Sequence, residues 1–520
     1  MMSSLAIKNL RELLYTAKGK MWVKILHISD IFTPVCPMKK AELVFVPSPG
    51  MGHFASMLEI AKLLVARDDR LCITVLIMRL SIDSKVEAYI ESLNDSSYTE
   101  CIQFIDLPQT SFKQGNDPMV FVSSFIESQK PHVKEAATKL KESRSGSNSP
   151  RLAGFVVDMF CSSMVDVAND FGVPTYLFFP SSASFLSLML HLQALRDEQK
   201  QDITEFKDSD AELVLSSFVN PIPARVLPGV VLHREGGTLI LDYARRWRET
   251  KGIIVNTFLE LESYAIHSFS DATNTPPVYP VGPILNLNGE DSHVSSGDQR
   301  SDIMKWLDDQ PQSSVVFLCF GSRGGFGDNQ VKEIAKALER GGFPFLWSLR
   351  RPPPKGKLAF PTEHENLEEV LPEGFLDRTA RIGKIIGWAP QVAILSHPAI
   401  GGFVSHCGWN SILESLWFGV PIATWPLYAE QQFNAFEMVK EMELAVEIVL
   451  DYLTEYTDNQ IIVTSEEIER GIKQLMENDS KIRKNVKEMT EKGRKALMDG
   501  GSSHFSLGRI IDDVITDSMP

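Results

Sequence analysis

The sequence alternates short, almost wholly apolar runs with segments of helical periodicity. The runs are 42–47, 71–78, 152–157, 175–179, 252–257, 314–320, 343–349, 401–405 and 420–425. Several of them show no polar alternation, which is typical of strands whose parallel sheet is covered by helices on both faces. Helical spacing recurs between the runs, for example at 57–65 and 331–338. The pattern therefore predicts repeated β–α units and an α/β fold.

One segment interrupts this pattern. Between Pro280 and Ser301 the chain loses its apolar period and becomes rich in Gly, Asn, Asp and Ser, which indicates a surface linker. The linker leaves two α/β halves of similar size. We expect two doubly wound domains that face each other, with ligands at the carboxyl ends of their strands.

Composition excludes several classes of protein. The 520 residues carry a formal net charge of −15, which argues against nucleic-acid or anionic membrane partners. No run of about 18 uncharged apolar residues occurs, so no membrane-spanning helix is predicted. The six cysteines are dispersed and contain no CxxC pair. This usage favours a reducing, cytoplasmic location over a disulfide framework or a zinc site.

Residues 1–37 differ from the rest of the chain. Basic residues outnumber acidic ones there, and the stretch ends near Pro34 and Pro37. We interpret it as an upstream start or a poorly ordered arm. An organelle transit peptide is the alternative, but the stretch contains little Ser and Arg for that purpose.

His53 follows the first apolar run through a glycine-rich turn at 48–52. The glycines permit a tight strand-to-helix turn, which places His53 at the carboxyl edge of the sheet. A neutral imidazole, with an ordinary pKa of about 6.5, can accept a proton there. A histidine without a task at a helix start is the alternative interpretation.

The same turn allows a different chemistry. Residues 50–55 match the dinucleotide fingerprint G-x-G-x-x-A of nicotinamide-dependent oxidoreductases. That fingerprint needs an acidic residue at the end of the second strand, where this chain has Arg79. Because an arginine suits a 2′-phosphate, an NADP-dependent oxidoreductase stays open as an alternative.

Asp158 directly follows the run 152–157. Its carboxylate either caps the next helix or accepts a hydrogen bond from one imidazole nitrogen, which would fix the tautomer of His53. No Ser in a G-x-S-x-G turn accompanies the pair, so a serine hydrolase is not predicted.

A turn in the second half suits a diphosphate. The run 401–405 leads into it, and a helix starts near Asn410. Gly408 permits close approach of the backbone, while the N–H groups and dipole of the helix start favour an anion. The side chains of His406, Asn410 and Ser411 add further donors.

The surrounding residues suit the rest of a nucleotide sugar. Glu414 shares a helical face with Asn410 and Ser411, and its carboxylate can accept hydrogen bonds from two ribose hydroxyls. Trp388 offers a flat surface for a base, with Gln391 on the neighbouring turn. Glu430 and Gln431 follow another strand end and can hold sugar hydroxyls. Each residue alone has a structural explanation as core, cap or surface; together they predict a nucleotide-sugar site.

The segment 388–431, with His-Cys-Gly-Trp-Asn-Ser at 406–411, resembles the donor-binding signature of plant secondary-product UDP-dependent glycosyltransferases. The resemblance extends over nearly all of residues 38–515. It includes Pro-Ser-Pro-Gly-Met-Gly-His at 47–53, Asp158, Trp-Leu-Asp at 306–308, Phe-Gly-Ser at 320–322 and Trp-Pro at 425–426. The subgroup that acts on flavonoids, phenylpropanoids and terpenoids is the most similar.

The resemblance implies a GT-B fold, in which two Rossmann-like doubly wound domains face each other across a cleft. Residues 1–37 would be an extension without a counterpart in the family. The other expected parts are an acceptor-binding domain (38–283), a linker (284–300), a UDP-sugar-binding domain (301–495) and a C-terminal helix that packs back on the first domain (496–520).

The resemblance also implies residue roles. His53 would be the catalytic base and Asp158 its orienting partner. The implied UDP-sugar-binding residues are Ser322, Trp388, Ala389, Gln391, His406, Gly408, Trp409, Asn410, Ser411, Glu414, Glu430 and Gln431. Of these, Trp388 would stack on uracil and Glu414 would bind the ribose.

The remaining donor contacts divide between phosphate and sugar. Ser322, His406, Asn410 and Ser411 would meet the diphosphate, whereas Trp409, Glu430 and Gln431 would contact the hexose. In this family, Gln at the closing position accompanies glucose, His accompanies galactose, and Trp at position 409 speaks against glucuronate.

The acceptor pocket is expected in the first half of the chain. Its candidate residues are Phe121, Phe125, Phe160, Ser181, Leu186 and Met189. Ser181 is included because many relatives carry Thr near the sugar in this region. The sequence does not identify the acceptor.

We therefore expect a cytoplasmic, monomeric glucosyltransferase that uses UDP-glucose and inverts the anomeric centre to form a β-O-glucoside on a small lipophilic acceptor. No metal or other cofactor is expected, because no Asp-x-Asp pair lies near the diphosphate turn. Two alternatives stay open. An oxidoreductase would leave 388–431 unexplained, and a non-catalytic UDP-sugar-binding protein would not need His53 and Asp158.

Overall fold

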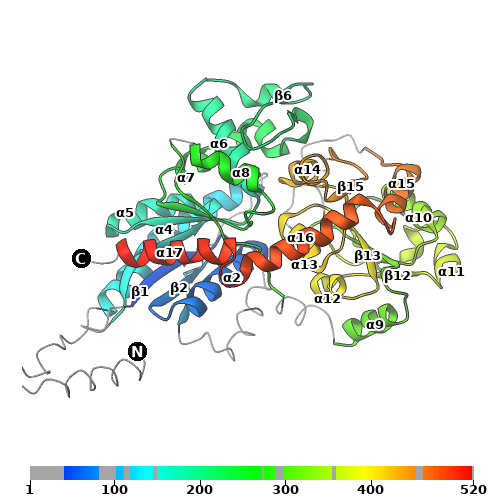
Figure 1. Ribbon diagram of the computed structural model, residues 1–520, viewed down its shortest axis with the longest axis horizontal. Helices are drawn as coiled ribbons and strands as arrows, with labels where there is room; N and C mark the ends of the chain where they lie inside the picture. The colour runs from blue at the N-terminus through cyan, green and yellow to red at the C-terminus, as the bar shows by residue number, and fades with distance from the viewer. Residues whose placement is uncertain are drawn as a thin grey trace, which may run out of the picture. The chain divides into compact units, whose positions relative to one another are not determined.

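A computed structural model describes residues 40–80, 89, 101–109, 118–144, 149–271, 274–287, 297–353, 359–452 and 461–517. The expected extension 1–37 lies outside the described residues, as does most of the linker 284–300. Within the described part, the chain forms two large parallel sheets, each covered by helices, and a small antiparallel sheet of β6 (Glu212–Leu213) and β7 (Ile222–Pro223) (Figure 1).

The first sheet has the strand order β3-β2-β1-β4-β5-β8-β9. Its strands are β1 (Ala41–Val46), β2 (Leu71–Ile77), β3 (Ile102–Asp106), β4 (Arg151–Asp158), β5 (Thr175–Phe179), β8 (Gly252–Val255) and β9 (Val278–Pro280). Every pairing is parallel. The chain leaves β1 towards β2 on one side and reaches β4 on the other, so the order reverses between β1 and β4.

The wholly buried β1 explains why its sequence lacks polar alternation. Leu43 and Phe45 pack into a core with α2 (Met51–Arg67) and α17 (Ser502–Asp517), whereas Val44 and Val46 join the opposite core. The opposite core includes residues of α4 (Pro118–Ser143), α6 (Ala183–Asp197) and α7 (Arg234–Trp247). Alternate side chains therefore point into two different cores, and both faces need apolar residues.

The second sheet has the order β12-β11-β10-β13-β14-β15 and is also parallel. Its strands are β10 (Val315–Cys319), β11 (Phe345–Ser348), β12 (Gly383–Ile386), β13 (Ile400–Ser405), β14 (Ile422–Thr424) and β15 (Ala445–Glu447). Here the order reverses between β10 and β13, where Cys319 pairs with Ser405. The turns that follow these two strands therefore lie side by side at the carboxyl edge.

Eight described α-helices precede, connect or follow the strands of the second sheet. They are α9 (Gly297–Asp308), α10 (Asp328–Gly341), α11 (Phe375–Thr379), α12 (Gln391–Leu395), α13 (Trp409–Phe418), α14 (Gln431–Phe436), α15 (Ser465–Leu475) and α16 (Lys481–Leu497). We call the two sheets with their helices the first and second lobes.

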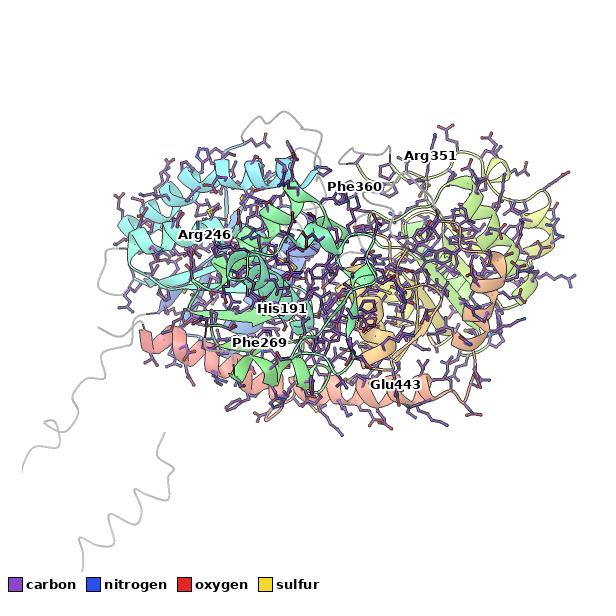
Figure 2. All side chains as sticks on the ribbon, turned by 90° about the horizontal axis from the view of Figure 1, so that it is seen from above. His191, Arg246, Phe269, Arg351, Phe360 and Glu443 are labelled. Carbon is purple, nitrogen blue, oxygen red and sulfur yellow. The ribbon has the colours of Figure 1, made fainter. Side chains whose placement is uncertain are left out.

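The last helix, α17, returns to the first lobe, where Ile510, Ile511 and Val514 join the core beneath β1 (Figure 1). Asp513 accepts a hydrogen bond from Tyr279 in β9. The chain therefore crosses between the lobes a second time along α16 and α17, which is visible as the long orange-to-red path in both views (Figures 1 and 2).

Candidate active site

His53 and Asp158 meet at the carboxyl edge of the first sheet. His53 lies in the first turn of α2, after β1, and Asp158 ends the neighbouring strand β4. The Nδ1 atom of His53 is 2.8 Å from Oδ2 of Asp158. The aspartate side chain is fully buried, whereas the histidine side chain is 30% exposed. Because Asp158 engages Nδ1, the proton sits there and Nε2 is left as the proton acceptor.

Asp158 fills both roles that the sequence left open. Its Oδ1 accepts the backbone N–H of Phe160 at 3.0 Å and so caps the short helix η2 (Met159–Met164), while Oδ2 faces His53. The cap fixes the carboxylate to the backbone. The carboxylate that accepts the hydrogen bond from His53 is therefore held in one orientation.

The pKa of His53 reflects opposing influences. Burial is the largest, and it lowers the pKa. The charge and hydrogen bond of Asp158, together with the charge of Glu430, act in the opposite direction and prevail, so the pKa is raised from its ordinary value of 6.5. The ring is thus a stronger base than a free imidazole.

In the second lobe, His406 lies between two glycines at the carboxyl edge. A Cβ atom on Gly408 would approach Nε2 of His406 to 2.6 Å, and one on Gly321 would overlap the same ring. Gly321 also has a φ of 72°, in the left-handed region that favours glycine. The turns after β10 and β13 therefore close tightly around the imidazole because both positions lack a side chain.

His406 is neutral in this environment. Burial, and secondarily the positive charge of Arg350, lower its pKa to about 3. Its Nδ1 is buried and has no hydrogen-bond partner in the described part of the chain. A buried nitrogen without a partner is unfavourable, so a ligand that bonds to it would be stabilised. His406 can offer such a ligand a hydrogen bond, but no charge.

Three predicted donor residues form a cluster on α12 and α13. The amide nitrogen of Gln391 donates to Ser411 Oγ at 2.9 Å and to Glu414 Oε2 at 2.7 Å. Ser411 and Glu414 lie one turn apart on α13, as their spacing predicts. This cluster presents a carboxylate and a hydroxyl beside the start of α13, where N–H groups favour an anion.

Trp388 precedes α12 and is half-buried, with Ala389 buried beside it. The guanidinium carbon of Arg350 lies 5.2 Å from the centroid of the Trp388 ring, within range of a cation–π contact. Arg350 also donates to the backbone oxygen of Ser322 at 3.2 Å. The side chain of Ser322 is exposed in the turn after β10.

Two neighbouring residues at the start of α13 contact the first lobe. The indole N–H of Trp409 donates to the backbone oxygen of Asn256 at 2.6 Å. The amide of Asn410 donates to Ser56 Oγ at 3.4 Å, and its own oxygen is buried without a partner among the described residues. A hexose contact by Trp409 would therefore need its backbone, because the indole N–H is already bonded.

Glu430 and Gln431 lie at the start of α14 and use their side chains differently. Glu430 accepts a hydrogen bond from Ser181 of the first lobe at 3.3 Å. Burial raises its pKa. Gln431 is buried, and its Oε1 accepts the backbone N–H groups of Leu427 and Tyr428 at 3.0 and 3.1 Å. These two donors fix the orientation of the amide, so the opposite end can only donate.

Comparisons with known proteins identify the family. Residues 279–493 match the family model described as "UDP-glucoronosyl and UDP-glucosyl transferase". The chain is 60% identical over 486 residues to UDP-glucose flavonoid 3-O-glucosyltransferase 6 of Fragaria ananassa, covering 92% of this chain and 100% of that protein. The chain belongs to the UDP-dependent glycosyltransferases. It is also 56% identical over 482 residues to UDP-glycosyltransferase 71A15 of Malus domestica, with 92% and 100% of the two chains covered.

Solved structures show the same GT-B fold for this glycosyltransferase. One is a transferase from Siraitia grosvenorii in complex with UDP, with a TM-score of 0.83, 52% identity, and 92% of this chain and 100% of that chain covered. Another is UGT71G1 of Medicago truncatula with UDP-glucose, with a TM-score of 0.82, 44% identity, and 92% and 98% covered. The family membership sets aside the oxidoreductase alternative. Consistent with this, Arg79 is paired with Asp106 at 2.6 Å.

The predicted acceptor residues of the glycosyltransferase fall into two groups. Phe160 lies 5.2 Å from His53 between ring centroids, and Ser181 faces Glu430. Phe121 is half-buried on α4. By contrast, Phe125, Leu186 and Met189 have 1% exposed surface or less and belong to the core of the first lobe. In this structure these three side chains have almost no surface to offer a ligand. The sequence suggested them because an apolar residue that lines a pocket and one that fills the core look alike in a sequence.

A cavity of about 590 Å³ opens between α4, η2 and α7. Its lining is Ser123, Ser124, Glu127, Ser128, Ser162, Ser163, Leu239, Asp242, Tyr243 and Arg246. None of the predicted acceptor residues is among them, although the rings of Tyr243 and Phe160 lie 6.0 Å apart.

Sequence reasoning missed Arg350 and Asn256. Arg350 directly follows the run 343–349, and Asn256 is the last residue but one of the run 252–257, so the strand-end rule that found His53 and Asp158 could have found them. In the described part of the glycosyltransferase, no group of three or more His, Cys, Asp or Glu is placed to hold a metal. The described helices include none long and apolar enough to cross a membrane.

Proposed function

We propose that this glycosyltransferase transfers glucose from UDP-glucose to a hydroxyl of a flavonoid-type acceptor, giving a β-O-glucoside and UDP. The observation that carries the proposal is the His53–Asp158 pair at 2.8 Å, with a raised histidine pKa. The activity for which the Fragaria ananassa relative is named, flavonoid 3-O-glucosyl transfer, supports the acceptor class at 60% identity.

The proposed reaction is a single displacement. Nε2 of His53 takes the proton of the acceptor hydroxyl while the acceptor oxygen attacks the anomeric carbon. The bond between that carbon and the phosphate oxygen breaks, and UDP leaves with the bonding electrons. Attack opposite the leaving group inverts an α-linked donor into a β-glucoside. The imidazolium, stabilised by Asp158, then releases its proton to solvent.

General-base help is needed because a phenol, with a pKa of about 10, is a poor nucleophile at neutral pH. Such help is typically worth about 10²–10⁴-fold in rate. In the proposed donor site, Trp388 stacks on uracil with Ala389 and Gln391 nearby, Glu414 binds the ribose, and the 406–411 segment with Ser322 holds the diphosphate.

The proposed hexose contacts follow from the orientations of three side chains. Gln431 donates from its amide nitrogen, because its oxygen is bonded to the 427–428 turn. Glu430 accepts from sugar hydroxyls. Trp409 contributes its backbone, and the acceptor binds near Phe160, Phe121 and Ser181.

The proposal extends to organisation and environment. We place the acceptor-binding domain at 38–283, the linker at 284–300, the donor domain at 301–495 and the returning segment at 496–520. The enzyme would act as a cytoplasmic monomer without a metal. The five described cysteines are all free, which fits a reducing compartment. Gel filtration checks the monomeric state, and transfer assays with and without a chelator check whether a metal is needed.

The test is transfer by the purified full chain. UDP-glucose is incubated with a panel of flavonoid, phenylpropanoid and terpenoid hydroxyl compounds, and the anomeric configuration of any product is read from its proton coupling. A flavonoid β-O-glucoside is expected. An α-linked product would refute the single displacement, and turnover with none of the acceptors would favour the non-catalytic alternative.

His53→Ala tests the base directly. Transfer should fall by at least about 10²-fold while UDP still binds, because the ring contributes to the proton transfer alone. His267→Ala is the matched control, since His267 is an exposed histidine in the same lobe. Transfer at the wild-type rate by His53→Ala would remove His53 from the base role.

A further inference from the structure

Arg350 lies at the carboxyl end of β11, beside the donor site, and is almost fully buried at 5% exposure. Its guanidinium donates to three backbone oxygens in the turn after β10. These are Gly321, Ser322 at 3.2 Å and Gly324 at 3.4 Å. One side chain therefore ties the end of β11 to the whole 321–324 turn.

Among the residues that the structure describes, the positive charge of Arg350 has no counter-ion. Among the described residues, no Asp or Glu lies within ion-pair distance of it, and its Nε–H is buried without a partner. Burial lowers the pKa of the guanidinium, as expected for a charge removed from water. An unpaired charge in the interior is strongly unfavourable unless an anion compensates it.

The residues around Arg350 indicate which anion would compensate its charge. Arg350 is close enough to His406 for its charge to contribute to the low pKa of that ring. His406 is neutral and offers no charge to a ligand. A diphosphate held at 406–411 carries negative charge, and Arg350 is a buried cation next to that site.

Arg350 also lies against the ring of Trp388. The guanidinium carbon lies 5.2 Å from the ring centroid, so it covers one face of the indole. A uracil ring that stacks on Trp388 would then use the other face. The same side chain thus contacts the base platform and the phosphate turn.

We propose that Arg350 is a positioning residue of the donor site, whose buried, unpaired charge attracts the diphosphate of UDP while its guanidinium holds Trp388 and the 321–324 turn in place. The inference rests on the proposed use of UDP-glucose. It deepens that function by assigning the positive charge of the donor site to a residue outside the 388–431 signature.

The experiment separates charge from shape by comparing UDP with uridine. Isothermal titration measures the affinity of both ligands for wild type, Arg350→Gln, Arg350→Lys and the control Arg351→Gln. Arg351 is the exposed neighbour of Arg350 (Figure 2). Arg350→Gln should weaken UDP binding by about tenfold or more, because a unit charge at low effective dielectric is lost. The affinity for uridine, which lacks phosphate, should fall by less than about threefold in the same variant.

Arg350→Lys should keep the wild-type ratio of UDP to uridine affinity within about threefold, because it keeps the charge and loses the planar fork. Arg351→Gln should bind both ligands like the wild type. Circular dichroism confirms that each variant is folded. Arg350→Met, which also removes the charge and should lose UDP affinity as Arg350→Gln does, keeps the test decisive where the glutamine variant does not fold.

Two results would overturn the inference. One is an Arg350→Gln protein that binds UDP as tightly as wild type. The other is a loss of UDP and uridine affinity by the same factor, which would make Arg350 a purely structural support. A wild-type protein that binds neither ligand would instead refute the proposed function, and the inference with it.

Discussion

Replacing Asp158 with Asn gives the sharpest test of the catalytic pair. The substitution preserves size, and an Asn at this position can still cap the N–H of Phe160, because Asn is as good a cap as Asp. The substitution replaces the charged carboxylate next to His53 with a neutral amide. The amide that faces Nδ1 at 2.8 Å either donates, which forces the proton onto Nε2, or accepts without charge.

Both consequences weaken the base. With the proton on Nε2, the ring cannot accept the acceptor's proton. With the proton on Nδ1, the imidazolium loses the carboxylate that raised its pKa, and burial, the largest single influence on His53, then lowers it. The loss should approach the full worth of general-base catalysis, about 10²–10⁴-fold in kcat. That range corresponds to about 3–5 kcal/mol of transition-state stabilisation.

The assay is the pH dependence of kcat with UDP-glucose and a flavonoid acceptor. Wild-type activity should fall as the pH drops through the raised pKa of His53, because protonated Nε2 is no base. In Asp158→Asn this fall of the residual activity should move to a lower pH than in wild type, since the pKa of His53 has decreased. UDP affinity should not change, because Asp158 belongs to the first lobe.

One pair of results would refute this reasoning. An Asp158→Asn enzyme that keeps wild-type kcat and the wild-type acid limb would show that the carboxylate neither fixes the tautomer nor tunes the base. Comparing the urea midpoints of the two proteins controls for damage to the fold.

Two further predictions concern the second lobe. His406 has an ordinary pKa of 6.5 when unfolded and about 3 when folded, so the unfolded chain binds more protons between these values and stability should fall as the pH drops through this window. We expect His406 to contribute a loss of about 2 kcal/mol between pH 7 and 5, measured by urea unfolding, and His406→Gln to flatten the profile by that amount; an identical slope in both proteins would contradict this. Gln431→Glu keeps an oxygen for the two N–H groups of the 427–428 turn but removes the NH₂ donor. It should lower kcat/KM for UDP-glucose by about tenfold with UDP binding unchanged, and a normal kcat/KM would remove Gln431 from the hexose contact.

The strands show what apolar patterning can and cannot predict. The apolar runs in the sequence correspond to β1, β2, β4, β5, β8, β10, β11, β13 and β14, all of them interior to their sheets. The runs did not include β3, β9, β12 and β15, which are the four edge strands of the two parallel sheets, nor the two-residue strands β6 and β7. An edge strand has a neighbour on one side only. β3 has two exposed and two half-buried residues, β12 is largely half-buried, and β9 and β15 have three residues each. Their sequences therefore lack the continuous apolar run.

The candidate site also has a part that the sequence could predict and a part that it could not. Position at a strand end depends on local sequence, so His53, Asp158 and the 406–411 turn could be predicted from it. Partners from distant parts of the chain could not. Nothing local shows that the indole N–H of Trp409 bonds to Asn256 or that Arg350 lies against Trp388. The neutral state of His406 likewise depends on burial and on Arg350, which only the folded chain brings together.

The contacts between the lobes connect the base to the donor site. Asn410, at the start of α13, bonds to Ser56, which lies one turn after His53 on α2. Glu430, at the start of α14, bonds to Ser181 and its charge helps raise the pKa of His53. Two residues proposed to hold the diphosphate and the hexose thus also contact the first lobe, among other contacts such as that of Glu441 with the backbone of Asn220. Because Glu430 both faces the proposed sugar site and helps raise the pKa of His53, we expect Glu430→Gln to lower the pKa of the base as well as to weaken the sugar contact, which the acid limb of the kcat profile would show.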